Sequence, residues 1–202
     1  MQSASPEGEP AAPAEPTDPG LRPDHQPDQQ PRRRLVTLIV TAVLVLVLDV
    51  ATKAVVVATM TDGQRIPVLG DTVSLYLIRN SGAAFSLATG MTWVLTLVAV
   101  AVVVGIARFA RRLRSAGWAI ALGLVLGGAL GNLADRFFRG PGPLEGHVVD
   151  FVSVGWWPVF NAADSAICCG GALLVVLALW GIEIDGRLSP RAGESPGTGG
   201  AR

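Results

Sequence analysis

The stretch LVTLIVTAVLVLVLDVATKAVVVAT, residues 35–59, decides the fold. A transmembrane helix needs about 20 mostly apolar residues, and this stretch is long enough for one. Its only charged residues are Asp49 and Lys53, which are four positions apart, so they share a helix face and can pair. A charge at mid-membrane costs about 2.5–3.5 kcal/mol on insertion scales, so the pair is either a neutralised structural pair or part of a site.

Three further apolar stretches follow residues 35–59. One lies within residues 80–107, with its helix starting near Leu87, and the others cover residues 115–134 and 159–182. The arginines at 32–34 and the run after them could also form a cleavable signal peptide. Apolar sequence resumes at residues 54–60, however, which favours a retained span. We predict a membrane protein with an all-α core of four transmembrane helices.

Composition supports this class and excludes others. The chain has 202 residues, 50% hydrophobic and 16% charged, with zero net charge, so it has no basic excess for binding nucleic acid. Its two cysteines, Cys168 and Cys169, are adjacent, which excludes a disulfide scaffold. Residues 1–34 and 185–202 are rich in Pro, Gly and polar residues, and we expect both to be disordered tails flanking a membrane domain at 35–184.

Arginine placement predicts the orientation. Arginines precede the first span at positions 32–34, and four more crowd the loop between the second and third spans at 108, 111, 112 and 114. The positive-inside rule places both clusters in the cytoplasm. Both termini are then cytoplasmic, and residues 60–86 and 135–158 face outward.

The outward segment 60–86 has its own secondary structure. Residues 72–77, TVSLYL, alternate polar and apolar side chains, and the turn pairs Asp62-Gly63 and Gly70-Asp71 flank RIPVL at 65–69. We therefore predict a small extracytoplasmic β-sheet between the first and second transmembrane helices.

Costly polar residues gather at the outer ends of the spans. Asn132 and Arg136 are spaced i, i+4 near the end of the third span, with Asp135 beside them. Asp135 could be part of a site, or it could be an interfacial side chain that snorkels to water. Asn161, Asp164 and Ser165 lie at the predicted start of the fourth span, and Asp150 precedes them in the outward loop. This convergence is the main functional signal.

Two carboxyl groups that share a proton can activate water, because like charges about 3 Å apart cannot both ionise. Asp150 and Asp164 suit this role, with Asn161 placed to orient them. Two alternatives remain open. One is a small proton-coupled four-helix transporter, and the other is a Ser–Lys membrane peptidase that uses Lys53 with Ser81, Ser86 or Ser165.

Five sequence blocks, in order, resemble the family of lipoprotein signal peptidase (signal peptidase II), the membrane aspartic peptidases of bacterial lipoprotein maturation. The blocks, all within residues 35–184, are DVATK (49–53), NSGAAF (80–85), GNLADR (131–136), VDF (149–151) and PVFNAADS (158–165). The resemblance implies a hydrolase in the bacterial cytoplasmic membrane that cleaves prolipoproteins just before the diacylglyceryl-modified cysteine. It also implies sensitivity to the cyclic peptide globomycin.

The resemblance further implies Asp150 and Asp164 as the catalytic pair. The supporting residues it implies are Asp49, Lys53, Asn80, Asn132, Arg136 and Asn161. It implies no metal or cofactor, and we expect a monomer whose site lies at the outer face beside membrane lipid. Only 13 residues separate the two aspartates, fewer than is usual in the family, which predicts a shorter flap over the site.

Overall fold

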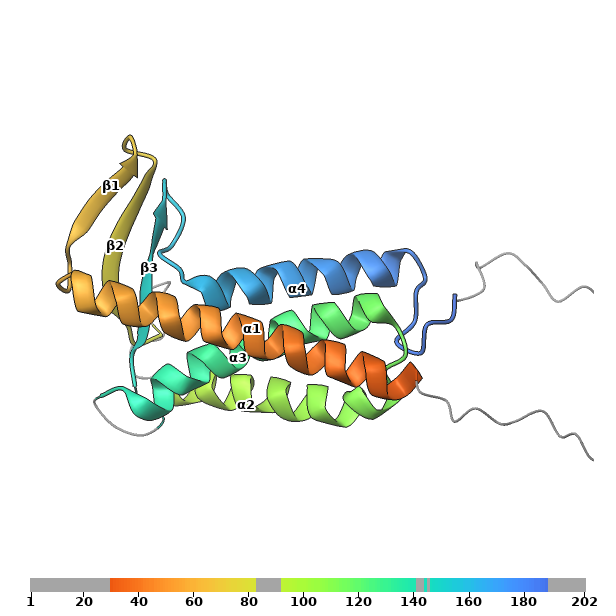
Figure 1. The fold of residues 1–202 in the computed structure, drawn as a ribbon. Coiled ribbons are helices and arrows are strands. Elements are labelled where there is room, and N and C mark those ends of the chain that lie inside the picture. The colour runs from red at the N-terminus through yellow and green to blue at the C-terminus, as the bar shows by residue number, and fades with distance from the viewer. Residues whose placement is uncertain (1–29, 83–91, 141–143, 145, 189–202) are drawn as a thin grey trace, which may run out of the picture.

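The computed structural model describes residues 30–82, 92–140, 144 and 146–188, and in it four helices form a bundle with a small sheet at one end (Figure 1). The helices are α1 (Gln30–Thr59), α2 (Thr92–Phe109), α3 (Ala116–Phe138) and α4 (Ala162–Leu179), with a short 3₁₀ turn, η1 (Ala110–Arg112), after α2. All four are long and apolar enough to cross a membrane, as predicted. The predicted tails and the predicted start of the second span near Leu87 lie outside the described residues.

The ends of the last two helices differ from the prediction. Helix α3 begins after its N-cap Ser115 but continues to Phe138, so Asp135 and Arg136 belong to the helix rather than to a loop. Helix α4 begins at Ala162 and ends at Leu179, inside the predicted range of 159–182. It starts there because Asn161 is an extended N-cap that forms a reciprocal capping box with Asp164.

Helix α3 lies at the centre of the bundle, in contact with the three other helices. Its glycines allow close approach: a Cβ at Gly123 would lie 2.8 Å from the Leu38 carbonyl oxygen, and one at Gly127 would lie 2.6 Å from that of Ala42. On α4, a Cβ at Gly170 would lie 2.7 Å from the Ala121 carbonyl oxygen of α3. Small residues at such crossings allow helix backbones to pack tightly where lipid provides no hydrophobic driving force.

The sheet has three antiparallel strands in the order β1-β2-β3. The predicted pair is present as β1 (Arg65–Leu69) and β2 (Val73–Asn80). The third strand, β3 (Val148–Val154), comes from the segment between α3 and α4, so the expectation that Asp150 lies in a loop was wrong. Its partner β2 is about 70 residues earlier in the chain, and local alternation cannot reveal so distant a pairing.

The sheet is fixed to the bundle by a small apolar core. Val56 and Met60 at the end of α1 pack with Leu77 of β2 and with Val149 and Phe151 of β3. Val149 and Leu77 are almost fully buried. Asp150 lies between Val149 and Phe151, so the packing of these two neighbours in the apolar core sets the position of its strand.

The glycine contacts between α1 and α3 give a stability prediction. We expect Gly127→Ala to destabilise the fold by about 1–3 kcal/mol, because the new methyl group would overlap the α1 backbone. Gly171→Ala is the matched control, since a Cβ there meets nothing within 4 Å and alanine favours a helix. Thermal unfolding of the detergent-purified proteins measures both; equal midpoints would contradict the proposed close packing.

Candidate active site

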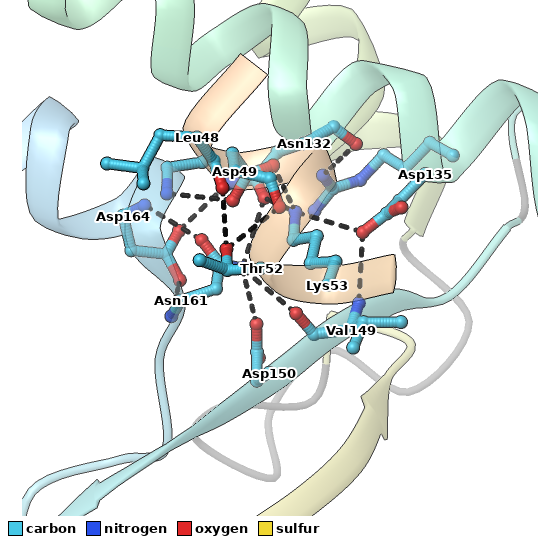
Figure 2. A network of polar contacts seen from close by, with 12 residues as sticks. Leu48, Asp49, Thr52, Lys53, Asn132, Asp135, Val149, Asp150, Asn161 and Asp164 are labelled. Atoms are coloured by element: carbon cyan, nitrogen blue, oxygen red, sulfur yellow. Dashed lines mark hydrogen bonds and ion pairs between the residues drawn. The ribbon is translucent and has the colours of Figure 1, made fainter. Parts of the chain in front are cut away.

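Lys53 lies at the centre of a buried polar network at the sheet end of the bundle (Figure 2). Its side chain is 1% exposed. Its Nζ lies 2.7 Å from Asp49 Oδ2, 2.9 Å from Asp135 Oδ2 and 3.1 Å from Asn132 Oδ1. The ammonium group thus makes two ion pairs and one hydrogen bond, and is surrounded by two carboxylates and an amide oxygen. The predicted Asp49–Lys53 pair is present, and it is joined by a second carboxylate.

Each of the two carboxylates also binds the backbone of another element. Asp49 Oδ1 accepts a hydrogen bond from the Ala163 N–H in the first turn of α4, at 2.9 Å. Asp135 Oδ2 accepts one from the Val149 N–H of β3, at 3.1 Å, and Asp135 also pairs with Arg139. Asp135 is buried, so it is not an interfacial side chain that snorkels to water. Through these ion pairs and hydrogen bonds, the two carboxylates connect α1, α3, α4 and β3.

Asn161 joins the two aspartates that the sequence singled out. The side chain is fully buried, and its Nδ2 donates to Asp150 Oδ1 at 2.7 Å. Its backbone N–H donates to Asp164 Oδ2 at 3.2 Å, and its Oδ1 accepts from the Asp164 N–H at 2.9 Å. Asn161, the N-cap of α4, therefore contacts both aspartates. Its side-chain Nδ2 binds Asp150, and the two reciprocal hydrogen bonds of the capping box hold Asp164.

The remaining carboxyl oxygens are bound by two other asparagines. Asn80 Nδ2, at the end of β2, donates to Asp150 Oδ2 at 2.8 Å. Asn132 Nδ2, on α3, donates to Asp164 Oδ1 at 2.8 Å. Each of the four carboxyl oxygens thus accepts a hydrogen bond from an asparagine. This arrangement holds the two carboxyl groups in fixed orientations.

Burial changes the acidity of Asp150. Desolvation of this residue, which is 2% exposed, is the largest effect and raises its pKa from 3.8 to about 6. The hydrogen bonds from Asn80 and Asn161 act in the opposite direction, and the negative charge of Asp164 adds to the rise. The environment therefore favours a proton on Asp150.

Arg136 completes the set. Its guanidinium is buried, and Nη1 donates to the Asn132 carbonyl oxygen at 3.1 Å. Among the described residues, its Nε has no hydrogen-bond partner. Asp164, Asp150 and Asp135 are close enough to interact with its charge. Arg136 thus places a positive charge beside the two aspartates and retains a free donor.

The eight residues predicted for the site are brought together from β2, β3, α1, α3 and the start of α4. They are Asp49, Lys53, Asn80, Asn132, Arg136, Asp150, Asn161 and Asp164. Sequence reasoning missed the contacts of Asp135 with β3 and with Arg139. The i, i+4 spacing of Asp135 and Arg139 was a signal for the second of these. Across the described part of the chain, no group of three His, Cys, Asp or Glu side chains could hold a metal ion.

The fold and the site together define a multi-pass membrane protein with a carboxylate pair buried at one end of its helix bundle. A family model described as signal peptidase (SPase) II matches residues 41–180. The chain belongs to this family, whose members are membrane peptidases that remove the signal peptides of lipoproteins.

Individual relatives agree with the family assignment. The lipoprotein signal peptidase of Rhodococcus jostii (strain RHA1) is 66% identical over 141 residues, which cover 70% of this chain and 71% of that protein. That of Mycobacterium avium (strain 104) is 61% identical over 140 residues, 69% of this chain and 77% of the relative. A solved bacterial membrane enzyme matches with a TM-score of 0.64 and 29% identity, covering 71% of this chain and 88% of its own.

The contacts of Lys53 give a prediction about stability. Lys53→Met leaves Asp49 and Asp135 buried without their shared cation, and we expect a loss of about 3–5 kcal/mol. Adding Asp49→Asn should restore part of this loss, since an amide oxygen can still accept the Ala163 hydrogen bond without a buried charge. Unfolding of the single and the double variant in detergent measures both free-energy changes. The prediction is contradicted if Lys53→Met alone is as stable as the parent protein.

Proposed function

We propose that this peptidase is an aspartic endopeptidase that removes signal peptides from prolipoproteins, cleaving just before the diacylglyceryl-modified cysteine. The observation that carries the proposal is the link between Asp150 and Asp164 through Asn161. The two carboxyl groups have unequal surroundings, as a general acid and a general base require. Asp150 is almost fully buried, whereas Asp164 is partly exposed at the third position of α4, where the helix dipole stabilises a negative charge.

The mechanism follows from this difference. Ionised Asp164 takes a proton from a water molecule, which attacks the scissile carbonyl carbon. Protonated Asp150 donates a hydrogen bond to the carbonyl oxygen as negative charge develops there. Collapse of the tetrahedral intermediate then breaks the C–N bond, and the leaving amine takes a proton from the pair.

A groove beside the pair supports a lipid-modified substrate. This cavity, of about 450 Å³, is lined by Asn161 and Ser165 and by residues of α1, α3 and α4. Its walls are mostly apolar and include Val45, Leu48 and Leu124. An acyl chain of diacylglyceryl-cysteine could lie in such a groove while the adjoining peptide bond reaches the carboxyl groups.

The positions of the arginines support an orientation with both termini in the cytoplasm. The segment 108–114, whose four arginines are exposed, connects α2 to α3 at the end of the bundle opposite the sheet (Figure 1). The sheet and the carboxylate pair then face the outer side of the cytoplasmic membrane, where signal peptides are removed. The hydrogen bonds that hold all four carboxyl oxygens of the pair are made within the chain, so the proposed monomer needs no residue from a second copy.

The contacts of Lys53 disfavour the Ser–Lys alternative. Its ammonium group is held between two carboxylates, which stabilise the charged form rather than the neutral amine that a general base must be. Ser165 Oγ donates to the Asn161 carbonyl oxygen instead, at 3.0 Å. Ser86 lies outside the described residues. The position of the carboxylates, at the sheet end of the helices, also disfavours a transporter, which would need them near mid-membrane.

Separate Asp150→Asn and Asp164→Asn variants test the proposal. We expect each to lower cleavage of a lipid-modified precursor by at least about 10²-fold, because the general acid or base is lost. The matched control is Asp71→Asn, at an exposed turn far from the pair. Substantial cleavage by either variant would reject the aspartic mechanism. Loss of cleavage in a folded Lys53→Met protein, with both aspartate variants active, would favour the Ser–Lys route.

The raised pKa of Asp150 predicts the pH dependence of cleavage. Asp150 holds its proton below about pH 6 and loses it above, so kcat/KM should fall as the pH rises through about 6. The hydrogen bond from Asn80 lowers this pKa, so Asn80→Ala should move the falling limb to higher pH. Initial rates of the parent protein and of Asn80→Ala across about pH 4–9, at constant ionic strength, locate the falling limb of each. An unchanged limb in Asn80→Ala would argue against Asp150 as the proton donor.

A further inference from the structure

A second cavity lies at the end of the bundle opposite the carboxylate pair. This groove, of about 590 Å³, is formed by α2, α3, the end of α4 and the segment that follows it. Most of its lining is apolar, and the exposed Glu183 is its one charged residue. The lining residues are Ile106, Phe109, Trp118, Leu122, Ala178 and the segment 181–184. We call it the arginine-end groove, because of the charges described next.

Arginines crowd one side of the arginine-end groove. Phe109, which lines it, lies between Arg108 and η1, and η1 contains Arg111 and Arg112. All three arginine side chains are exposed. The next arginine, Arg114, donates its backbone N–H to the carbonyl oxygen of Ile184, another lining residue, at 3.0 Å. Four arginines therefore lie in the segment 108–114, which adjoins the lining of the groove, against one acidic lining residue, Glu183, so the charge around the groove is net positive.

The wall of the groove is held in place by a specific contact. Trp118 Nε1 donates to the Ile182 carbonyl oxygen at 2.8 Å, which fixes the segment after α4 against the start of α3. The N–H groups of Arg114 and Ser115 both donate to Ile184, and strengthen this connection. The groove is thus a formed feature of the fold, bounded by hydrogen-bonded backbone.

We propose that the arginine-end groove binds an anionic phospholipid, with an acyl chain in the groove and the phosphate at the arginines. The groove opens between membrane-spanning helices at the end where the arginines place the headgroup region, so lipid is the molecule present there. A guanidinium group pairs with a phosphate through two parallel hydrogen bonds, and basic pockets between transmembrane helices select anionic headgroups. The charges specify an anionic lipid, and the apolar wall specifies its chain.

Native mass spectrometry of the full chain in detergent tests the proposal. The probes are phosphatidylglycerol, phosphatidylcholine with the same acyl chains, and glycerol phosphate as the headgroup without chains. We expect phosphatidylglycerol to bind at least about tenfold more tightly than phosphatidylcholine, with a preference that falls as salt rises. Glycerol phosphate should not bind measurably. Equal binding of the two lipids, or binding of glycerol phosphate as tight as that of phosphatidylglycerol, would overturn the proposal.

Two variants locate the lipid. The double variant Arg111→Gln/Arg112→Gln keeps Arg108 and Arg114 and should reduce the preference for phosphatidylglycerol several-fold. Ala178→Trp should fill the groove and weaken binding of both lipids, and Ala178→Leu is the milder form if the first does not fold. The matched controls are Arg65→Gln on β1 and Ala172→Trp on α4, both exposed and outside the groove. The proposal fails if the controls lose as much binding as the test variants.

Neither result depends on the carboxylate pair. A protein with Asp150→Asn should lose cleavage and still select phosphatidylglycerol, whereas Ala178→Trp should retain the buried network around Lys53. If Asp150→Asn removed lipid selection to the same extent as Ala178→Trp, the groove would not be a separate site, and the proposal would be rejected.

Discussion

A single ammonium group, that of Lys53, connects most of the polar network at the sheet end of this molecule. The membrane cannot hydrate a buried cation, so Lys53 must find its partners inside the protein. It finds them in Asp49 of its own helix and in Asp135 and Asn132 of α3. Each of these partners binds a further element: Asp49 binds the start of α4, Asp135 binds β3, and Asn132 binds Asp164. The need to neutralise one charge therefore positions the elements that carry the two aspartates.

Close helix packing makes these contacts possible. A Cβ at Gly131 would lie 2.5 Å from Asp49 Oδ2, so only glycine leaves room for that carboxylate beside α3. Gly127 and Gly123 bring the same two helices together nearer the other end. The bundle therefore depends on small residues along α3 and on buried ion pairs at one end. The two features depend on each other, because close helix packing without the ion pairs would bury an unpaired carboxylate.

The sequence was sufficient to predict the spans, the first two strands and the gathering of polar residues at one end of the bundle, because each carries a local signal. Apolar length marks the spans, alternation marks β1 and β2, and polar residues are conspicuous inside apolar helices. It could not predict β3, whose pairing with β2 is long-range, or the start of α4, which the cap Asn161 sets at Ala162. It also left the role of Asp135 open, because a charge near a helix end can face either water or protein. The burial of Asp135, with its ion pair to Lys53 and its hydrogen bond from the Val149 N–H, decides between them.

The charges of the network favour one protonation state of the pair. Among the described residues, four carboxyl groups and three basic groups take part; these are Asp49, Asp135, Asp150 and Asp164, with Lys53, Arg136 and Arg139. Asp49, Lys53, Asp135 and Arg139 form a connected chain of alternating charge with no net charge. Arg136 then faces Asp150 and Asp164, and one positive charge can neutralise only one carboxylate. Because an uncompensated buried charge is costly, the network is neutral when the pair holds one proton, and burial favours its placement on Asp150. The buried cation and the proton on the pair thus meet the same requirement, that the buried network at the sheet end of the bundle carry no net charge.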